Sequence, residues 1–295
     1  MLYPVFLLIY FLASCLAILF YRRNFPFLST KIGYLSWFFA TFIFWITRPA
    51  AAYLPDYVLK ALSMFGGYWS FFLYYTLLLF LIHCLVLFIL KRLKKIDVQL
   101  RYYSLLITKA GLVIIFICMI IGTFEAYNPI VRHEVINSNK ITAPIRIVLV
   151  SDLHLGNFLG KEYCERMVER INAENPDVVL IAGDIIDDRY GIVKRQGSIE
   201  PLVNLKTKFG VAAVLGNHDY FDRRTDEEID DLKRLDISVL VNESKTFAEI
   251  HVVGLKDFSK DQSTENLKTF AIDHQNQFLI LLDHQPRRII EASEE

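Results

Sequence analysis

The chain has 295 residues, of which 54% are hydrophobic, 14% aromatic and only 22% charged. Its formal net charge is zero, yet residues 1–127 carry a net charge of +8 and residues 128–295 a net charge of −8. This division excludes a disordered chain, a fibrous repeat and a single soluble domain, and the acidic second half argues against a nucleic-acid partner. We therefore expect two domains in different solvents.

Residues 1–127 contain four apolar stretches that approach the length of about 20 residues needed to cross a bilayer as a helix. They cover about residues 1–21, 32–54, 67–90 and 104–124. Because backbone groups in lipid must be satisfied within their own segment, the prediction is an N-terminal bundle of four transmembrane helices. Within these stretches, His83 and Lys109 are candidate functional residues. The alternative is that His83 bonds a neighbouring helix and Lys109 reaches the interface.

The connections between these stretches differ in basic charge. The first and third connections hold eight basic residues, against two in the second. The positive-inside rule places the two basic connections in the cytoplasm. Arg22 and Arg23 follow the first stretch rather than precede it, so this stretch is expected to be a retained anchor. The four spans then place the acidic half outside the cytoplasm.

The pattern changes after a linker at residues 128–143, and a second domain is expected over residues 144–295. Short β-branched runs alternate there with charged segments of helical periodicity such as Lys161–Ala173, which predicts an α/β fold class. The expected strands are Ile145–Val150, Val178–Ala182, Val211–Leu215, Ile237–Val241, Ile250–Gly254 and Phe278–Leu282.

Charged residues in this half are expected to face solvent. Thr225 and Glu228 have the spacing of a capping box, and Asp226–Asp231 would form the solvated face of the helix that follows. Arg287 and Arg288 follow His284 and could meet a phosphate, but as residues of a first helical turn they are predicted to face solvent.

Polar motifs follow four of the expected strands. They are Asp152-Leu153-His154, Gly183-Asp184-Ile185-Ile186-Asp187, Gly216-Asn217-His218-Asp219 and Asp283-His284. Each motif alone is compatible with a turn or a helix cap. Ligands of open α/β sheets bind at the carboxyl ends of the strands, so together the motifs predict one site. Its oxygen and imidazole donors, without thiolate, suit Mn²⁺, Fe or Zn²⁺ in a hydrolytic centre.

This ordered set, D-x-H, G-D-x-x-D, G-N-H-D and H, closely resembles the calcineurin-like metallophosphoesterase superfamily over about residues 144–286. The whole chain looks like the membrane-anchored bacterial members of that superfamily. The resemblance implies a four-layer α/β/β/α sandwich with a centre of two divalent metal ions. It also implies an integral protein of the bacterial inner or plasma membrane.

The resemblance also implies roles for individual residues. Asp152 and His154 would hold the first metal, Asp184 would bridge both metals, and Asn217 and His284 would hold the second. A bridging carboxylate suits Asp184, because one Asp can offer an oxygen to each metal.

Two further residues would be catalytic by the same resemblance. His218 would supply the proton of the leaving group, since an imidazole can do so near neutral pH. Asp219 would orient the His218 ring and fix its tautomer.

One departure from the family pattern is the G-H-x-H motif, which does not occur in this sequence. The histidines of that motif complete both metal sites in the family. His133, His251 and His274 lack the right context to replace them. The phosphoesterase domain is therefore expected to be incomplete at its C-terminal end.

The function predicted from these observations is a membrane-anchored, metal-dependent phosphoesterase that cleaves phosphodiester or diphosphate bonds. A membrane tether raises the local concentration of lipid-linked phosphoester substrates, which makes them attractive. The alternative is a non-catalytic scaffold or transporter-like membrane protein with a remnant phosphoesterase domain. The missing histidines, His83 and Lys109 favour that alternative, and the intact motifs oppose it.

Overall fold

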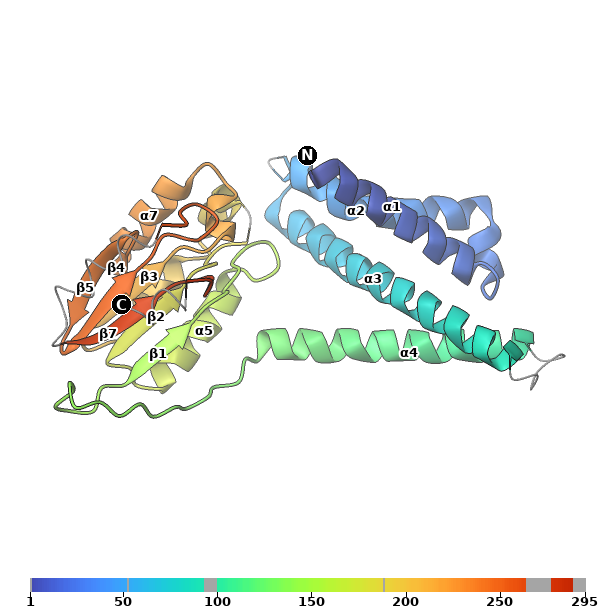
Figure 1. Cartoon of the computed structure of the whole chain (residues 1–295). Coiled ribbons are helices and arrows are strands. Elements are labelled where there is room, and N and C mark those ends of the chain that lie inside the picture. The colour runs from blue at the N-terminus through green and yellow to red at the C-terminus, as the bar shows by residue number, and fades with distance from the viewer. Residues whose placement is uncertain (1, 52, 93–99, 188, 264–276, 289–295) are drawn as a thin grey trace. The chain divides into compact units, whose positions relative to one another are not determined.

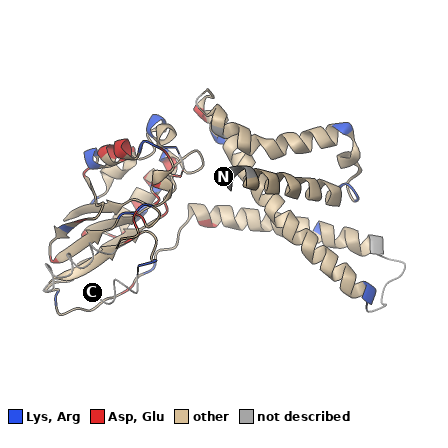
Figure 2. Ribbon diagram, turned by 45° about the horizontal axis from the view of Figure 1, so that its top comes forward, with Lys and Arg blue, Asp and Glu red and all other residues tan. Residues whose placement is uncertain are grey.

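The computed structural model describes residues 2–51, 53–92, 100–187, 189–263 and 277–288. The chain divides into two compact units, Met1–Arg132 and His133–Glu295, which we call the helical unit and the α/β unit. Charged residues are sparse in the helical unit and frequent in the α/β unit (Figure 2). The boundary lies within the predicted linker.

The helical unit consists of α1 (Leu2–Tyr21), the short 3₁₀ turn η1 (Pro26–Ser29), α2 (Lys31–Ala50), α3 (Asp56–Arg92) and α4 (Leu100–Tyr127) (Figure 1). Helix α3 starts well before the predicted residue 67. It continues through Gly66 because this glycine packs against α2, where an added Cβ would lie 2.8 Å from the Cα of Phe44. Small residues at such contacts let two helix backbones approach closely.

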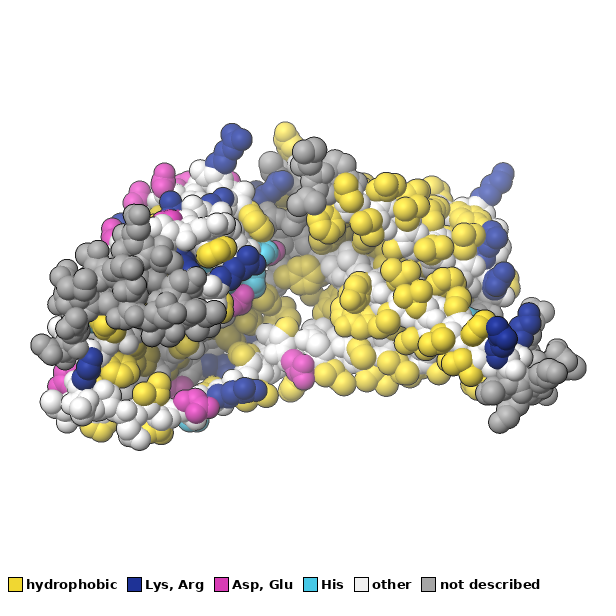
Figure 3. All heavy atoms as spheres, in the orientation of Figure 1, with side chains coloured by type: hydrophobic (Ala, Val, Ile, Leu, Met, Phe, Trp, Pro, Cys, Tyr) yellow, Lys and Arg dark blue, Asp and Glu magenta, His cyan; other side chains and the backbone are white. Residues whose placement is uncertain are grey.

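Two of these helices are long and apolar enough to cross a membrane. They are α3, with 37 residues, and α4 from Tyr102 to Tyr127, with 26 residues. The other two offer shorter apolar stretches, Val5–Tyr21 and Lys31–Thr47. Length and composition thus support a spanning role for α3 and α4 only, and not the full set of four predicted spans. Hydrophobic side chains cover the visible face of this unit (Figure 3).

Polar side chains in the interior of the helical unit contact each other across helices. The hydroxyl oxygens of Ser14 and Thr41 lie 2.7 Å apart, and both side chains are buried. His83 is 7% exposed, and its Nε2 lies 3.4 Å from the Oγ of Ser104 on α4. Lys109 is exposed on the surface of α4. His83 therefore makes the interhelical contact that was the structural alternative to a functional role.

The α/β unit contains two sheets (Figure 1). The first is parallel in the order β1 (Ile147–Val150), β2 (Val178–Ala182), β3 (Gly210–Val214) and β4 (Ile237–Val239). The second has the order β5 (Glu243–Phe247), β6 (Ile250–Gly254) and β7 (Phe278–Leu282), with β5 antiparallel and β7 parallel to β6. The remaining elements are α5 (Lys161–Ala173), α6 (Tyr190–Gln196), η2 (Glu200–Asn204), η3 (His218–Tyr220) and α7 (Thr225–Arg234). The predicted α/β class is confirmed.

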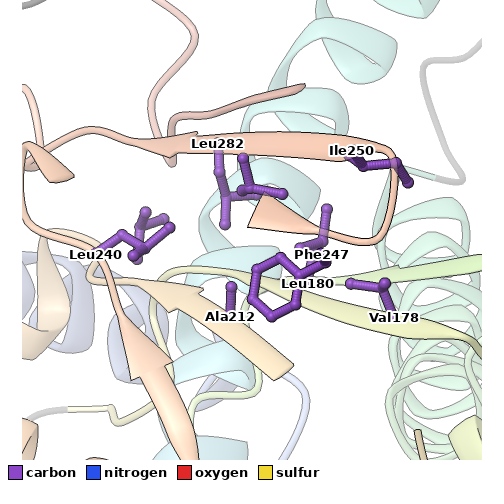
Figure 4. Close-up of a cluster of buried hydrophobic side chains, with 9 residues drawn as sticks. Val178, Leu180, Ala212, Leu240, Phe247, Ile250 and Leu282 are labelled. Carbon is purple, nitrogen blue, oxygen red and sulfur yellow. The ribbon is translucent and has the colours of Figure 1, made fainter. Parts of the chain in front are cut away.

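The core lies between the two sheets (Figure 4). Leu180 of β2, Phe247 of β5 and Leu282 of β7 meet there, each less than 4% exposed. Burial of one such side chain contributes roughly 1.5–3 kcal/mol. Val179 and Ile181 alternate with Leu180 and are fully buried on the other face of β2, as a parallel strand covered on both sides requires. No helix follows α7 among the described residues, so the predicted fourth layer is not seen there.

The register of the first sheet brings the ends of its strands together. Val150 of β1 pairs with Ile181 of β2, and Ala182 of β2 pairs with Val214 of β3. The segments that follow β1, β2 and β3 therefore leave the sheet at one edge, which is the edge that carries the polar motifs.

Candidate metal centre

Three motif residues at this edge adopt left-handed backbone conformations. Their φ angles are 56° for Asp152, 44° for His154 and 49° for Asp184. Such angles cost about 1–3 kcal/mol for a residue other than glycine, and they persist only where surrounding contacts impose them. Here the amides of Asp152 and His154 donate to the carbonyls of Gly183 and Asp184, each at 3.0 Å. The loop after β1 is thus held along the loop after β2.

Two glycines allow the loops after β2 and β3 to touch. An added Cβ on Gly216 would lie 2.1 Å from Oδ1 of Asp184, which no real side chain could tolerate. Gly183 has a φ of +86°, and its added Cβ would lie 2.7 Å from the amide nitrogen of Gly216. Glycine is required at both positions because the two backbones approach so closely.

The predicted ligands converge on one carboxylate. Oδ2 of Asp184 lies 3.6 Å from Nε2 of His154 and 3.3 Å from Nε2 of His284. The same nitrogen of His154 lies 3.5 Å from Oδ1 of Asp152. Nδ1 of His284 lies 2.8 Å from the carbonyl oxygen of Ala182, so its Nε2 is the atom that faces Asp184. Segments far apart in the sequence therefore bring imidazoles to a single carboxylate.

Asn217 lies at the same edge but makes a different contact. Its Oδ1 accepts a hydrogen bond of 2.9 Å from Nε2 of Gln285, the residue after His284. The next amide, that of His218, donates to Oδ1 of Asp184 at 2.9 Å. Four of the five predicted metal ligands thus follow strands of the first sheet, while His284 reaches Asp184 from the end of β7 in the second sheet, so the site does not lie at the edge of a single sheet as predicted. Their role as ligands stays a prediction.

The donor set fits a hard or borderline divalent cation. Ligand atoms of Asp152, His154 and Asp184 lie within 4.8 Å of one another and are oxygens and an imidazole nitrogen. Such donors suit Mn²⁺, Fe and Zn²⁺.

The cysteine of the α/β unit, Cys164 of α5, is not a candidate ligand. It is fully buried, and this burial raises its pKa to about 12, so it offers no thiolate at neutral pH.

Contacts within the site keep the central carboxylate ionised. Burial alone would raise the pKa of Asp184, but hydrogen bonds from the His284 ring and the His218 amide outweigh it and lower that pKa. The same bond to Asp184 raises the pKa of His284 to about 9, against the opposing effect of its burial. A cation in this site would take the place of the proton on His284.

His218 contacts Asp187 rather than the carboxylate of Asp219. Its Nδ1 hydrogen-bonds the carbonyl oxygen of Asp187 and lies 3.5 Å from Oδ1 of the same residue. The His218 ring also meets the ring of His154 edge-on, at a centroid distance of 4.7 Å. The predicted contact between Asp219 and the His218 ring is therefore replaced by Asp187. Asp187 is the last residue of the motif G-D-x-x-D, but the motif does not predict that Asp187 contacts the His218 ring.

Asp219 instead ties two backbone segments together. It is fully buried, and its two carboxylate oxygens accept hydrogen bonds from the amides of Ile186 (2.9 Å) and Gly216 (2.7 Å). Burial raises its pKa to about 6 in spite of these bonds. Its carboxylate joins the loops after β2 and β3, which carry Asp184 and Asn217.

The acidic helix α7 packs differently from the prediction. Glu228 and Asp231 are 0% and 5% exposed, so the expectation of a solvated face is wrong for these two residues. Residues three and four apart share one side of a helix, and this side, with Leu232, packs inward. The predicted capping box is not formed, because Thr225 is the first residue of α7 and its N-cap is Arg224, which makes no side-chain cap bond. The hydroxyl of Thr225 instead donates to the carbonyl oxygen of Asp219 in η3, at 3.0 Å.

Arg288 also departs from the prediction that it faces solvent. It is 2% exposed, and its guanidinium bonds both carboxylate oxygens of Asp283, at 2.9 and 3.1 Å. Two further bonds reach the carbonyls of Lys256 and Asp261. This two-pronged pairing fixes the residue next to His284.

The buried carboxyl of Glu228 predicts a pH-dependent stability. Burial and the nearby Asp219 raise its pKa well above the ordinary value. Above about pH 4.5 the unfolded chain loses this proton while the folded unit keeps it, so the free energy of unfolding falls as pH rises toward the folded pKa. We expect Glu228→Gln to flatten this fall above about pH 4.5.

Cys164 provides the measurement, because it is the buried cysteine of the α/β unit. Its labelling by dithiodipyridine in increasing urea, read by peptide mass spectrometry, reports unfolding at each pH. The exposed Glu169→Gln is the matched control and should keep the slope of the native chain. An unchanged slope in Glu228→Gln would contradict the prediction.

The sequence profile of the calcineurin-like phosphoesterases matches residues 145–292, which contain every residue of this site. The chain belongs to the calcineurin-like phosphoesterase family. Its α/β unit is the phosphoesterase domain, and members of the family use a dinuclear metal centre. The predicted family resemblance is thereby confirmed.

Several metallophosphoesterases resemble the chain. An uncharacterized one from Helicobacter pylori is 31% identical over 173 residues, which cover 57% of this chain and 46% of the relative. Another from Campylobacter jejuni is 27% identical over 259 residues, or 85% of this chain and 67% of the relative. A Danio rerio transmembrane protein with metallophosphoesterase domain is 36% identical over 98 residues, or 33% and 22%. The chain spans about half the length of the Helicobacter pylori relatives it matches.

Proposed function

We propose that the chain is a membrane-anchored, metal-dependent phosphoesterase that hydrolyses phosphodiester or diphosphate bonds. One observation carries this proposal. A single oxygen of Asp184 lies within 3.6 Å of the imidazole nitrogens of both His154 and His284, which come from opposite ends of the domain sequence. A carboxylate so placed can serve two cations at once.

The residues that would hold the two ions are Asp152 and His154 for the first, Asn217 and His284 for the second, and Asp184 between them. Held by these residues, Mn²⁺, Fe or Zn²⁺ would lower the pKa of water at neutral pH and would offset the charge of the phosphate oxygens. Asn217 would then exchange the hydrogen bond that its Oδ1 accepts from Gln285 for a metal ion.

His218 would supply the proton to the departing oxygen. Its Nδ1 is held by Asp187, which leaves Nε2 as the nitrogen that can meet a substrate. A neighbouring carboxylate keeps an imidazole in one orientation and stabilises its protonated form. Asp187 is thus a positioning residue in the proposed reaction.

The proposal includes anchoring in a membrane and a lipid-linked substrate. The membrane anchor is supported by the two long apolar helices α3 and α4, and by the Danio rerio relative that is named a transmembrane protein. The connection between these helices is basic in sequence, which favours a cytoplasmic position and an extracytoplasmic phosphoesterase domain in a bacterial inner membrane. An anchored enzyme meets lipid-linked phosphoesters at high local concentration.

The non-catalytic alternative is less well supported. The positive φ angles of Asp152, His154 and Asp184 are strained, and such strain is typical of functional sites. A domain without a functional site would not be expected to keep it. Nε2 of His83 contacts Ser104 of the neighbouring helix, as the structural interpretation of this residue expects.

Hydrolysis of bis-p-nitrophenyl phosphate in sealed, right-side-out membrane vesicles tests this proposal. We expect vesicles containing the full chain to release p-nitrophenol from externally added substrate with Mn²⁺, to stop with EDTA, and to recover with excess Mn²⁺. Activity that needs permeabilised vesicles would contradict the orientation. Absence of turnover in both preparations, with metal bound, would contradict the hydrolase itself.

A further inference from the structure

Phe221 is an exposed aromatic residue in direct contact with the proposed acid of the site. It directly follows η3, the short turn that begins with His218, and 62% of its surface is exposed. Its ring lies 4.5 Å from the His218 ring, centroid to centroid, with the planes tilted by 45°. It therefore places an exposed apolar ring against the imidazole that would supply the proton to the departing oxygen.

The other exposed phenylalanine of the α/β unit among the described residues, Phe209, has different surroundings. Phe209 is 37% exposed and lies beneath the ammonium of Lys208, 4.8 Å from its ring centroid. It stands just before β3, whereas the metal-ligand candidates follow that strand. Among the described ring contacts, Phe221 is the exposed phenylalanine that touches a site histidine.

The surroundings of Phe221 combine aromatic and basic groups. The ammonium of Lys260 lies 5.5 Å from the centroid of the adjacent Tyr220 ring, and Arg223 is exposed two residues further on. An anionic substrate is attracted by these cations, while an apolar group gains contact with the ring.

We propose that Phe221 is a specificity-determining residue that receives an apolar leaving group, aromatic or aliphatic, of a phosphodiester or diphosphate. This inference rests on the proposed function. In hydrolysis, the bond from phosphorus to the departing oxygen breaks, water supplies the new oxygen on phosphorus, and His218 donates the proton to the departing oxygen. Phe221 packs against the carbon skeleton of that alcohol and selects against a fully hydroxylated one.

A comparison of two leaving groups tests this role in the full chain with Mn²⁺. One diester releases p-nitrophenol and the other releases glycerol. We expect Phe221→Ala to lower kcat/KM for the first about tenfold, chiefly through KM, and to change the second less than about twofold. Phe209→Ala is the matched control and should leave both unchanged. Equal losses for both substrates in Phe221→Ala would overturn the inference and leave the hydrolase intact.

Binding of inert phosphonates gives a readout without turnover. Phenylphosphonate and hexylphosphonate should bind the Mn²⁺-loaded chain more tightly than methylphosphonate in calorimetry, and Phe221→Ala should remove most of this preference. Phe221→Leu should keep it for the hexyl and lose it for the phenyl compound if stacking matters, which separates aromatic from aliphatic ligands. Identical affinities for all three in the native chain would overturn the inference, whether or not the protein hydrolyses any diester.

Discussion

Replacing Asp184 by Asn should abolish both metal retention and diester hydrolysis. Asp184 Oδ2 lies against imidazoles from two separate loops, and Oδ1 accepts the amide of His218. An amide at this position offers one oxygen and no negative charge, so neither cation is held. Without the cations, the transition state loses several kcal/mol of charge stabilisation. Because about 1.4 kcal/mol of activation free energy corresponds to a factor of ten in rate, the reaction should slow at least about a thousandfold.

The measurement combines Mn²⁺ content by elemental analysis with initial rates on bis-p-nitrophenyl phosphate. Asp230→Asn removes a carboxylate from the exposed side of α7 and is the matched control. Protection of Cys164 from thiol reagents shows whether the domain of each variant remains folded. A folded Asp184→Asn protein that retains its metal and its rate would refute the assignment of the centre.

Replacing His218 by Ala should have a large effect that depends on the leaving group. A proton donor contributes about 10²–10⁴-fold when the departing alkoxide is strongly basic. It contributes little when p-nitrophenolate departs as a stable anion. We therefore expect a loss of at least about a hundredfold for a diester that releases an alkyl alcohol, and a much smaller loss for bis-p-nitrophenyl phosphate.

Asp187→Asn should also lower the rate more for the alkyl diester than for bis-p-nitrophenyl phosphate, but by a smaller factor than His218→Ala. Asp187 acts through the His218 ring, and the backbone carbonyl oxygen of residue 187 still bonds that ring in the variant. Rates for the two substrates are compared at equal metal content across both variants. Equal losses for both leaving groups in His218→Ala would mean that His218 supports the metals or the fold rather than supplying a proton.

The strand ends and their motifs were predictable because their signals are local. The run Val178–Ala182 is apolar throughout, as a strand buried on both faces must be, and Gly183 and Asp184 follow it at once. Strand β5 was not predicted, because its sequence Glu243–Phe247 is mostly polar and its pairing with β6 lies outside any local pattern.

Buried charges were not predictable by the same reasoning. The sequence around Glu228 has the spacing of an exposed, capped helix, and only the packing of α7 shows that its inner side carries carboxylates. Arg288 is buried because Asp283 and two backbone carbonyls receive its guanidinium, a set that the sequence does not bring together. The partner of His218 was missed for the same reason, since a motif gives spacing and not contacts.

The close approach at Gly216 limits how this scaffold can diversify. An added Cβ on Gly216 would lie 2.1 Å from Oδ1 of Asp184, so position 216 admits no side chain. A substitution there therefore cannot change the shape of the site. Phe221 comes five residues later, directly after η3, and its side chain is largely exposed. In proteins with this fold, a change of substrate preference is therefore expected at the turn that holds Phe221. The loops after β2 and β3, which carry Asp184 and Gly216, would keep the same reaction.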